Sequence, residues 1–153
     1  MARLETLVAL LKRMGLKPQP LRKPRIREMH DVEVLAENHH LAYIRLFEGR
    51  PPYYRGWLEI YGIDWSRARQ GLLEKLVEAA SGALEPGETL FIEYAGDRDT
   101  DTLLDRGARP EETWIGRMLA AHGFTGIADM YFPEGFMEGG PKLRAVKPLS
   151  GRK

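Results

Sequence analysis

The sequence predicts a single α/β (α+β) domain, residues 1–153, with a mixed and mostly antiparallel sheet of about six strands and helices on both faces. Three alternating runs between residues 32 and 63 indicate an antiparallel meander. A helical stripe over 64–83 is followed by a strand, 89–94, that is apolar on both faces, which is typical of the centre of a sheet. Because a meander leads into this helix and strand, the sheet cannot be all parallel.

The first segment, residues 1–30, predicts a helix followed by a proline-rich linker. Apolar residues recur along this segment with the period of an α-helix up to Gly15, which suits the position just past a helix end. Pro18, Pro20 and Pro24 argue against regular structure until about Asp31. The helix is expected to pack on the main body or on a second copy of the chain, so a homodimer remains open.

Residues 31–148 form the predicted core, and residues 149–153 form a basic tail. In each run of the meander, side chains alternate between the two faces of the sheet because the period of a strand is two. One face is aliphatic and the other carries aromatic and charged side chains. The alternation sets Ala42, Ile44 and Leu46 against Tyr43, Arg45 and Phe47, and Leu58 and Ile60 against Trp57, Glu59 and Tyr61.

The second half of the chain predicts helices that alternate with strands. Asp64 is a candidate N-cap for a helix that extends to about Ala83. The connection over 96–112 is well above the usual ~6 residues and therefore suggests a functional loop or lid. A helix over 112–122 leads into a terminal hairpin over 124–148.

Composition limits the class of function. The chain has 153 residues, 43% apolar and 29% charged, with a net charge of +1, so no overall field attracts it to nucleic acid or to acidic lipid. The basic segments 21–27 and 151–153 lack the interleaved aromatic side chains that bind single-stranded nucleic acid. Cysteine is absent, which excludes disulfides, thiolate nucleophiles and Cys-based zinc sites. We expect a cytoplasmic protein without a membrane segment, with a composition that would suit a thermophile.

Five stretches carry a resemblance to a known fold. They are a strand over 56–64, the helix 65–80, the strand 90–95, the helix that ends in "HGF" at 115–124, and the hairpin from Asp129 to Val146. This order resembles the GCN5-related N-acetyltransferase (GNAT) superfamily, which binds acyl-CoA, and the resemblance covers about residues 32–148. In that family the fifth strand diverges from the fourth and opens the substrate cleft.

The resemblance implies an acyl-CoA-dependent transfer to a small amine, with acetyl-CoA or another acyl-CoA as cofactor. It places the pantetheine arm on the backbone of Tyr61, Gly62 and Ile63. It places the pyrophosphate at Arg67, Arg69, Gln70 and Gly71. The chain departs from the family pattern at two places. In the phosphate loop, Ala68 and Leu73 take the outer positions, and Leu119 stands where many members have a tyrosine that acts as the general acid.

Glu93 is the candidate general base, since burial in an apolar strand would favour proton uptake near neutral pH. Tyr94 or Tyr131 would replace the missing acid. The alternative for Glu93 is a structural ion pair with Arg45 or Arg144. Four further residues are candidate substrate ligands: Glu59, Glu134, Phe136 and Glu138. The four histidines are scattered or adjacent in a strand, so no metal site is expected.

Two other functions remain open at this point. The missing tyrosine and the imperfect phosphate loop favour a non-catalytic ligand-binding or oligomerisation module on the same fold. The segment 84–148 also looks like the last third of an S-adenosylmethionine-dependent methyltransferase. That class needs an early Gly-rich turn after its first parallel strand, and no such turn occurs before Leu84.

Overall fold

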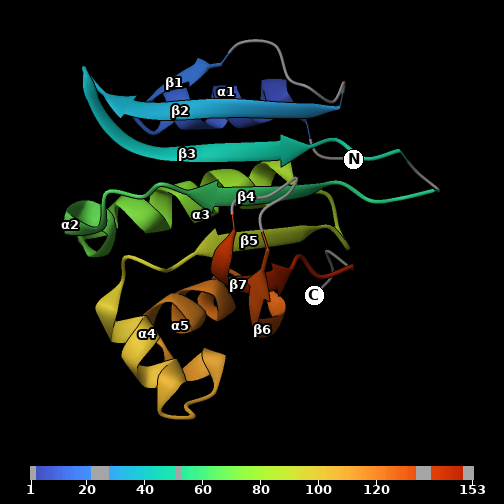
Figure 1. Cartoon of the computed structure of the whole chain (residues 1–153). Coiled ribbons are helices and arrows are strands. Elements are labelled where there is room, and N and C mark those ends of the chain that lie inside the picture. The colour runs from blue at the N-terminus through green and yellow to red at the C-terminus, as the bar shows by residue number, and fades with distance from the viewer. Residues whose placement is uncertain (1–2, 22–27, 51–52, 134–138, 150–153) are drawn as a thin grey trace.

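The computed structural model describes residues 3–21, 28–50, 53–133 and 139–149. They form an α+β domain with one seven-stranded mixed sheet in the order β1-β2-β3-β4-β5-β7-β6 (Figure 1). The elements are α1 (Leu4–Arg13), β1 (Lys17–Pro20), β2 (Met29–Ala36), β3 (His39–Phe47), β4 (Trp57–Tyr61), α2 (Trp65–Arg67), η1 (Ala68–Leu72), α3 (Leu73–Ala83), β5 (Thr89–Glu93), α4 (Arg98–Asp105), η2 (Pro110–Glu112), α5 (Trp114–Ala121), β6 (Thr125–Phe132) and β7 (Gly140–Val146).

The pairing of the strands confirms the predicted fold class. Neighbouring strands are antiparallel except β4 and β5, which run parallel from Trp57 opposite Thr89 to Ile60 opposite Ile92. The connection between two parallel strands has to cross the sheet, and α3 makes this crossover. The terminal hairpin places β7, not β6, next to β5, so the last strand of the chain lies inside the sheet.

The sheet has one strand more than the six expected, and the additional strand is β1. The expectation that the segment after the first helix lacks regular structure was wrong. Lys17–Pro20 pairs antiparallel with β2 although two of its four residues are prolines. Proline cannot donate a hydrogen bond to a ladder, but it is tolerated in an edge strand, where its nitrogen can face away from the partner. Regular structure therefore resumes before the linker, and β2 begins at Met29 rather than after Asp31.

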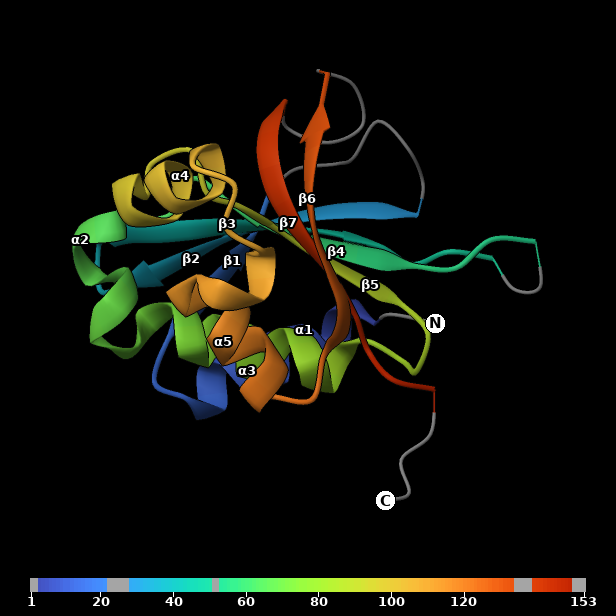
Figure 2. The same ribbon diagram turned by 90° about the horizontal axis from the view of Figure 1, so that it is seen from below.

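The aliphatic face of the sheet forms the core. Its side chains are fully or almost fully buried under α1, α3 and α5, which lie on one side of the sheet (Figure 2). The helix α4 lies on the other side of the sheet, past the ends of the strands (Figure 2). The buried strand residues are Val32, Val34, Ala42, Ile44, Leu46, Leu58, Ile60, Leu90, Ile92, Leu143 and Ala145.

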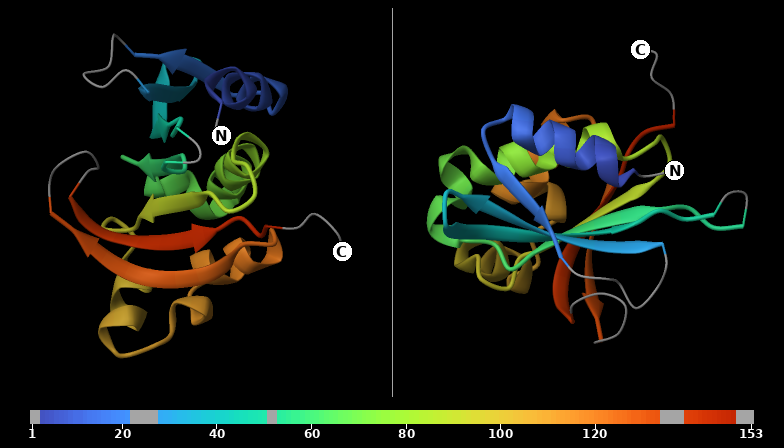
Figure 3. Two further views of the ribbon diagram at one scale, coloured as in Figure 1. Left: turned by 90° about the vertical axis from the view of Figure 1, so that its right-hand side faces the viewer. Right: turned by 90° about the horizontal axis from the view of Figure 1, so that it is seen from above.

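The N-terminal helix packs on the body of the domain. Leu7 and Leu11 of α1 have no exposed surface, and α1 lies beside α3 (Figure 3). The contact is close because Gly82 of α3 has no side chain: a Cβ there would lie 2.4 Å from Leu10 Cδ1. Of the two expected positions for α1, the structure therefore shows the one on the main body.

The other face of the sheet carries aromatic and charged side chains, as the alternation predicts. Aromatic rings contact one another from β3 to β6, with centroid distances between 5.4 and 6.1 Å, through Phe47, Trp57, Phe91 and Phe132. Among the described residues, no helix is both long enough and apolar enough to cross a membrane.

Candidate functional site

The candidate site begins where the parallel ladder of β4 and β5 ends. The last paired residues are Ile60 and Ile92, and Gly62 and Glu93 lie just beyond this end of the ladder. Gly62 follows β4 with φ +58°, and a Cβ at this position would lie 2.7 Å from the ring of Tyr43, so only glycine fits. We call the region between Gly62 and Glu93 the β4–β5 opening.

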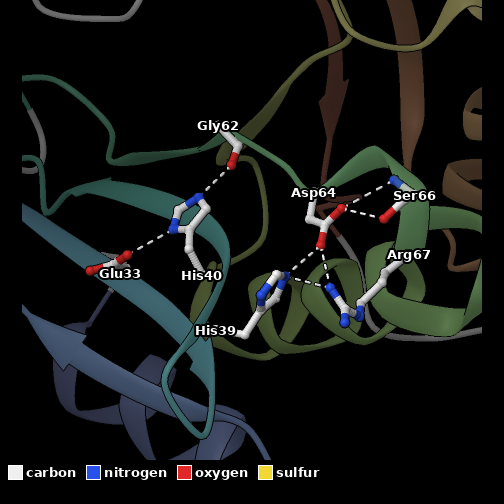
Figure 4. A network of polar contacts seen from close by, with 7 residues as sticks. All are labelled: Glu33, His39, His40, Gly62, Asp64, Ser66 and Arg67. Carbon is white, nitrogen blue, oxygen red and sulfur yellow. Dashed lines mark hydrogen bonds and ion pairs between the residues drawn. The ribbon is translucent and has the colours of Figure 1, made fainter.

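Side chains from two strands hold the peptide groups of Gly62. The Gly62 N–H donates to Glu93 Oε1 at 3.2 Å. The Gly62 carbonyl lies 2.7 Å from His40 Nε2, a contact shown in Figure 4. The other ring nitrogen of His40 lies 2.7 Å from Glu33 Oε2. The two ring nitrogens of His40 thus contact β2 through Glu33 and the end of β4 through Gly62.

The turn after the opening is held by Asp64, which caps α2 as predicted. Its carboxylate accepts hydrogen bonds from Ser66 N and Oγ, at 3.2 and 2.6 Å, and from Arg67 Nη1 at 2.5 Å. His39 Nε2 lies 2.9 Å from the same carboxylate (Figure 4). The hydrogen bonds from Ser66, His39 and Arg67 lower the pKa of Asp64 well below its usual range.

This lowered pKa predicts an acid-sensitive turn. A carboxylate with a lower pKa in the folded state adds stability above its unfolded pKa of about 3.9, and this stability is lost as the pH falls further. We expect Asp64→Ala to lower the free energy of unfolding by about 1 kcal/mol at pH 7, as for a lost cap. The difference from the wild type should shrink below about pH 4. Urea unfolding at pH 7, 5 and 3 measures it, and a difference that stays constant over this range would contradict the role of the charge.

The helix predicted from Asp64 to Ala83 is interrupted, which the sequence analysis missed. Gln70 (φ −90°, ψ 23°) and Gly71 (φ 104°, ψ −12°) leave the helical region, and the Leu73 N–H donates to the carbonyl of Ala68 across a wide turn. A residue with a side chain would be strained at this φ, whereas glycine adopts it readily. The kink separates α2 from α3 and places the N-terminal end of α3, the positive end of its dipole, next to Gly71.

Two pockets flank this kink, and Gly71 lines both. The first, of about 250 Å³, lies between η1, the start of α3 and α5, and its lining includes Arg69, Glu74 and Trp114. The second, of about 180 Å³, lies toward the β2–β3 turn, and its lining includes Arg67, Gln70 and Lys75. We call them the α5 pocket and the β3 pocket. The α5 pocket takes its name from Trp114, Met118 and Ala121 of α5, which line it.

The arginines expected at a pyrophosphate already have partners. Arg67 is paired with Asp64, as described above, and it also contacts His39. Arg69 Nη1 lies 2.6 Å from Asp99 Oδ2 of α4, and its guanidinium lies 4.9 Å from the centre of the Trp114 ring. Both arginine side chains are about half exposed, and exposed ion pairs contribute little stability, so an anionic ligand can compete for either cation.

The residues predicted to act on protons lie in different environments. Glu93 accepts from Gly62, while its two expected partners are engaged elsewhere: Arg45 with Asp31 at 2.8 Å and Arg144 with the Gly126 carbonyl at 2.8 Å. The Tyr94 hydroxyl donates to Asp129 Oδ1 at 2.6 Å. Burial, followed by this hydrogen bond and the charge of Asp129, raises the pKa of Tyr94, so the phenol is a weaker acid than usual.

The remaining predicted residues are also placed. Tyr131 on β6 is 78% exposed. Glu59 is fully buried, and Lys142 Nζ lies 2.7 Å from its Oε2. Tyr61 ends β4, where its hydroxyl accepts from Arg45 Nη2 at 3.2 Å, and Ile63 is buried. Glu134, Phe136 and Glu138 lie outside the described residues. The roles given to all these residues stay predictions.

Three residues that the sequence analysis did not select shape this region: His40, Lys142 and Trp114. His40 was set aside because adjacent histidines in a strand point to opposite faces, and this divergence is what lets His39 reach Asp64 while His40 reaches Gly62. Trp114 Nε1 donates to Asp97 Oδ2 at 2.7 Å and thereby ties α5 to the start of α4. No short motif in the sequence marks any of the three.

The order of the elements, the parallel β4–β5 pair and the terminal hairpin define a GNAT-like fold, as the resemblance implied. The chain belongs to the family described as "Protein of unknown function (DUF1122)", whose model matches residues 13–153.

A solved structure, described as a protein of unknown function from Aquifex aeolicus VF5, is 28% identical, with a TM-score of 0.74 over 89% of this chain and 72% of that chain. An acetyltransferase of the GNAT family from Streptococcus pneumoniae is 12% identical, with a TM-score of 0.44 over 80% of this chain and 68% of that chain. A putative acetyltransferase from Salmonella typhimurium, solved with its cofactor acetyl-CoA, is 14% identical, with a TM-score of 0.41 over 81% of this chain and 66% of that chain. The latter two scores are too low to carry a functional argument. No curated protein matches the chain.

Proposed function

We propose that this protein is an acyl-CoA-dependent N-acyltransferase that acts on a small amine. The observation that carries the proposal is the pairing of two features on consecutive segments of chain. The β4–β5 opening exposes the end of a parallel ladder at Gly62, and the kink at Gly71 lies a few residues further on, beside a pocket lined by Arg69. A long ligand with an amide-containing arm and a pyrophosphate requires two such features in succession.

The residues present fit such a donor in two respects. A backbone donor at the end of a ladder can bind an amide as an added strand would. The start of α3 and Arg69 supply positive potential beside open space, because no atom lies within 4 Å of where a Cβ of Gly71 would be. The donor would thus be held at Gly62 and Ile63 and at Arg69 and Gly71. We place the pyrophosphate in the α5 pocket, because Arg69 and the start of α3 lie together in its lining.

The donor supplies an activated thioester carbonyl. The amine nitrogen forms a C–N bond to this carbonyl, the C–S bond breaks, and the amine loses one proton while the thiolate gains one. Glu93 stands at the opening and would accept the amine proton, directly or through a water molecule. Tyr94 and Tyr131 remain the candidates to protonate the thiolate. The raised pKa of Tyr94 makes it the weaker proton donor, and Tyr131 is the more accessible of the two.

A specific observation supports the non-catalytic alternative. Leu119, which stands where the GNAT family has the tyrosine that acts as general acid, is fully buried. The N–H and the carbonyl of Gly62 are both already bonded to side chains. The methyltransferase alternative has no such support, because β1 to β4 pair antiparallel and provide no early parallel strand.

Thermal unfolding with acetyl-CoA tests the proposal. A ligand at a hundredfold excess over its Kd adds about 2.7 kcal/mol of stability, which for a domain of this size raises Tm by about 5–10 °C. We expect a rise with acetyl-CoA and none with S-adenosylmethionine. Arg69→Gln should reduce the rise, whereas Lys75→Gln, in the β3 pocket, should not. An unchanged Tm at millimolar acetyl-CoA would refute the proposed function.

A further inference from the structure

The Gly62 N–H is bonded to a side chain just beyond the end of the parallel ladder. Gly62 lies two residues past Ile60, the last residue of β4 that pairs with β5. Its N–H donates at 3.2 Å to the carboxylate of Glu93, the last residue of β5. The residue expected to take the amine proton therefore occupies the donor group expected to bind the pantetheine arm.

These two roles exclude each other in one conformation. A carboxylate that accepts from Gly62 N–H blocks that donor, and its own oxygen is engaged by the backbone. If an amide carbonyl of the acyl donor takes the Gly62 N–H, Glu93 has to leave it. The released carboxylate then stands at the opening without this bond and can accept a proton from an amine.

We propose that the acyl donor displaces Glu93 from Gly62, so that the base becomes available to the acceptor only after the donor has bound. This inference rests on the proposed function and adds an order to it: donor first, amine second. The step exchanges one hydrogen bond for another, with no covalent change. In this scheme the hydrogen bond from Gly62 holds the Glu93 carboxylate beside the opening until the donor binds.

His40 is a positioning residue in this scheme. Its contact to the Gly62 carbonyl does not involve the N–H, so it can persist while Glu93 leaves. Glu33 of β2 lies against its other ring nitrogen, and the ring of Tyr43 lies 4.6 Å from its own, which fixes the orientation of the imidazole. His40 thus holds the adjoining Gly62–Ile63 peptide group in place when Glu93 leaves.

Calorimetric titration with CoA, which lacks an acyl group and cannot react, tests the displacement. We expect Glu93→Ala to bind CoA about tenfold more tightly than the wild type, because no side chain competes for Gly62, equivalent to about 1.4 kcal/mol. Glu93→Gln keeps an oxygen that can accept from Gly62 and should bind within a few-fold of the wild type. Glu74→Ala is the control for the loss of a negative charge near the donor. It removes a carboxylate that lines the α5 pocket but lies against His122 and not against Gly62.

The outcomes separate the inference from the function on which it rests. Tighter binding by Glu93→Ala, but not to the same degree by Glu74→Ala, supports the displacement. Equal or weaker binding by Glu93→Ala, in a titration where the wild type binds, overturns the displacement and leaves the acyltransferase proposal intact. If neither the wild type nor any variant binds CoA, the proposed function itself falls. In steady-state kinetics with an accepted amine, the initial rates should follow an ordered sequence with the donor binding first, and a random order would contradict the inference.

Discussion

Replacing Lys142 with alanine is expected to lower the free energy of unfolding by about 3–5 kcal/mol, the largest loss of stability that we predict for a single polar residue. Lys142 on β7 and Glu59 on β4 are both fully buried, and 2.7 Å separate Lys142 Nζ from Glu59 Oε2. The substitution removes the cation that lies 2.7 Å from a buried carboxylate, so less of the cost of burying that charge is offset. Equilibrium urea unfolding at neutral pH measures the loss.

Two further variants make this prediction specific. The double variant Glu59→Leu with Lys142→Met removes both charges and should recover most or all of the stability, since apolar residues of similar size can replace a buried ion pair. Lys12→Ala, which removes an exposed lysine from α1, should stay within about 0.5 kcal/mol of the wild type. If Lys142→Ala were as stable as Lys12→Ala, the buried pair would not be a determinant of stability.

The second large effect is expected on catalysis. Glu93→Gln should lower kcat by about 10²- to 10⁴-fold, because an amide cannot accept the amine proton. Its hydrogen bond from Gly62 can persist, so the fold and the binding of the donor should be nearly unchanged. The measurement is the steady-state rate of thiol release from acetyl-CoA with a series of small primary amines.

Glu78→Gln provides the matched control, because Glu78 is an exposed glutamate on α3. Its kcat should equal that of the wild type. A Glu93→Gln enzyme with full kcat would show that another group accepts the proton, and the assignment of Glu93 as base would have to be abandoned.

Much of the fold could be predicted from local patterns. Alternation in β3 and β4 places aliphatic side chains on one face and aromatic or charged ones on the other, and the buried residues follow this division. Asp64 was identifiable as a cap because its side chain acts on a backbone N–H two residues away. Such features depend on neighbours in the sequence.

Other features could not be predicted because they depend on long-range pairing or on conflicting local signals. The pair between Glu59 and Lys142 exists only because β7 inserts next to β5, which brings its side chains within reach of β4. β1 forms despite Pro18 and Pro20 because an edge strand can omit donors. The kink at Gly71 was hidden by an apolar stripe that continues through it, with Ala68 before the kink and Leu72, Leu73 and Leu76 after it, all buried.

The candidate site shows the same division. Tyr61, Gly62 and Gly71 were selected on a resemblance in element order, and the structure brings the β4–β5 opening and the kink onto successive segments. The contacts around Gly62 come from three separate strands and could not be inferred: Glu93 from β5, and His40 from β3 supported by Glu33 from β2.

The most direct test of the account is a titration of the ¹⁵N-labelled protein with CoA, followed by amide NMR. The account predicts that the largest shifts occur at Gly62, at Gly71 and Leu72, and at the indole N–H of Trp114, with little change at Gly15 and Gly107. Shifts confined to the β3 pocket, at Leu16 and Ala36, would contradict the placement of the donor. A spectrum that does not change at millimolar CoA would contradict the acyl-CoA site itself.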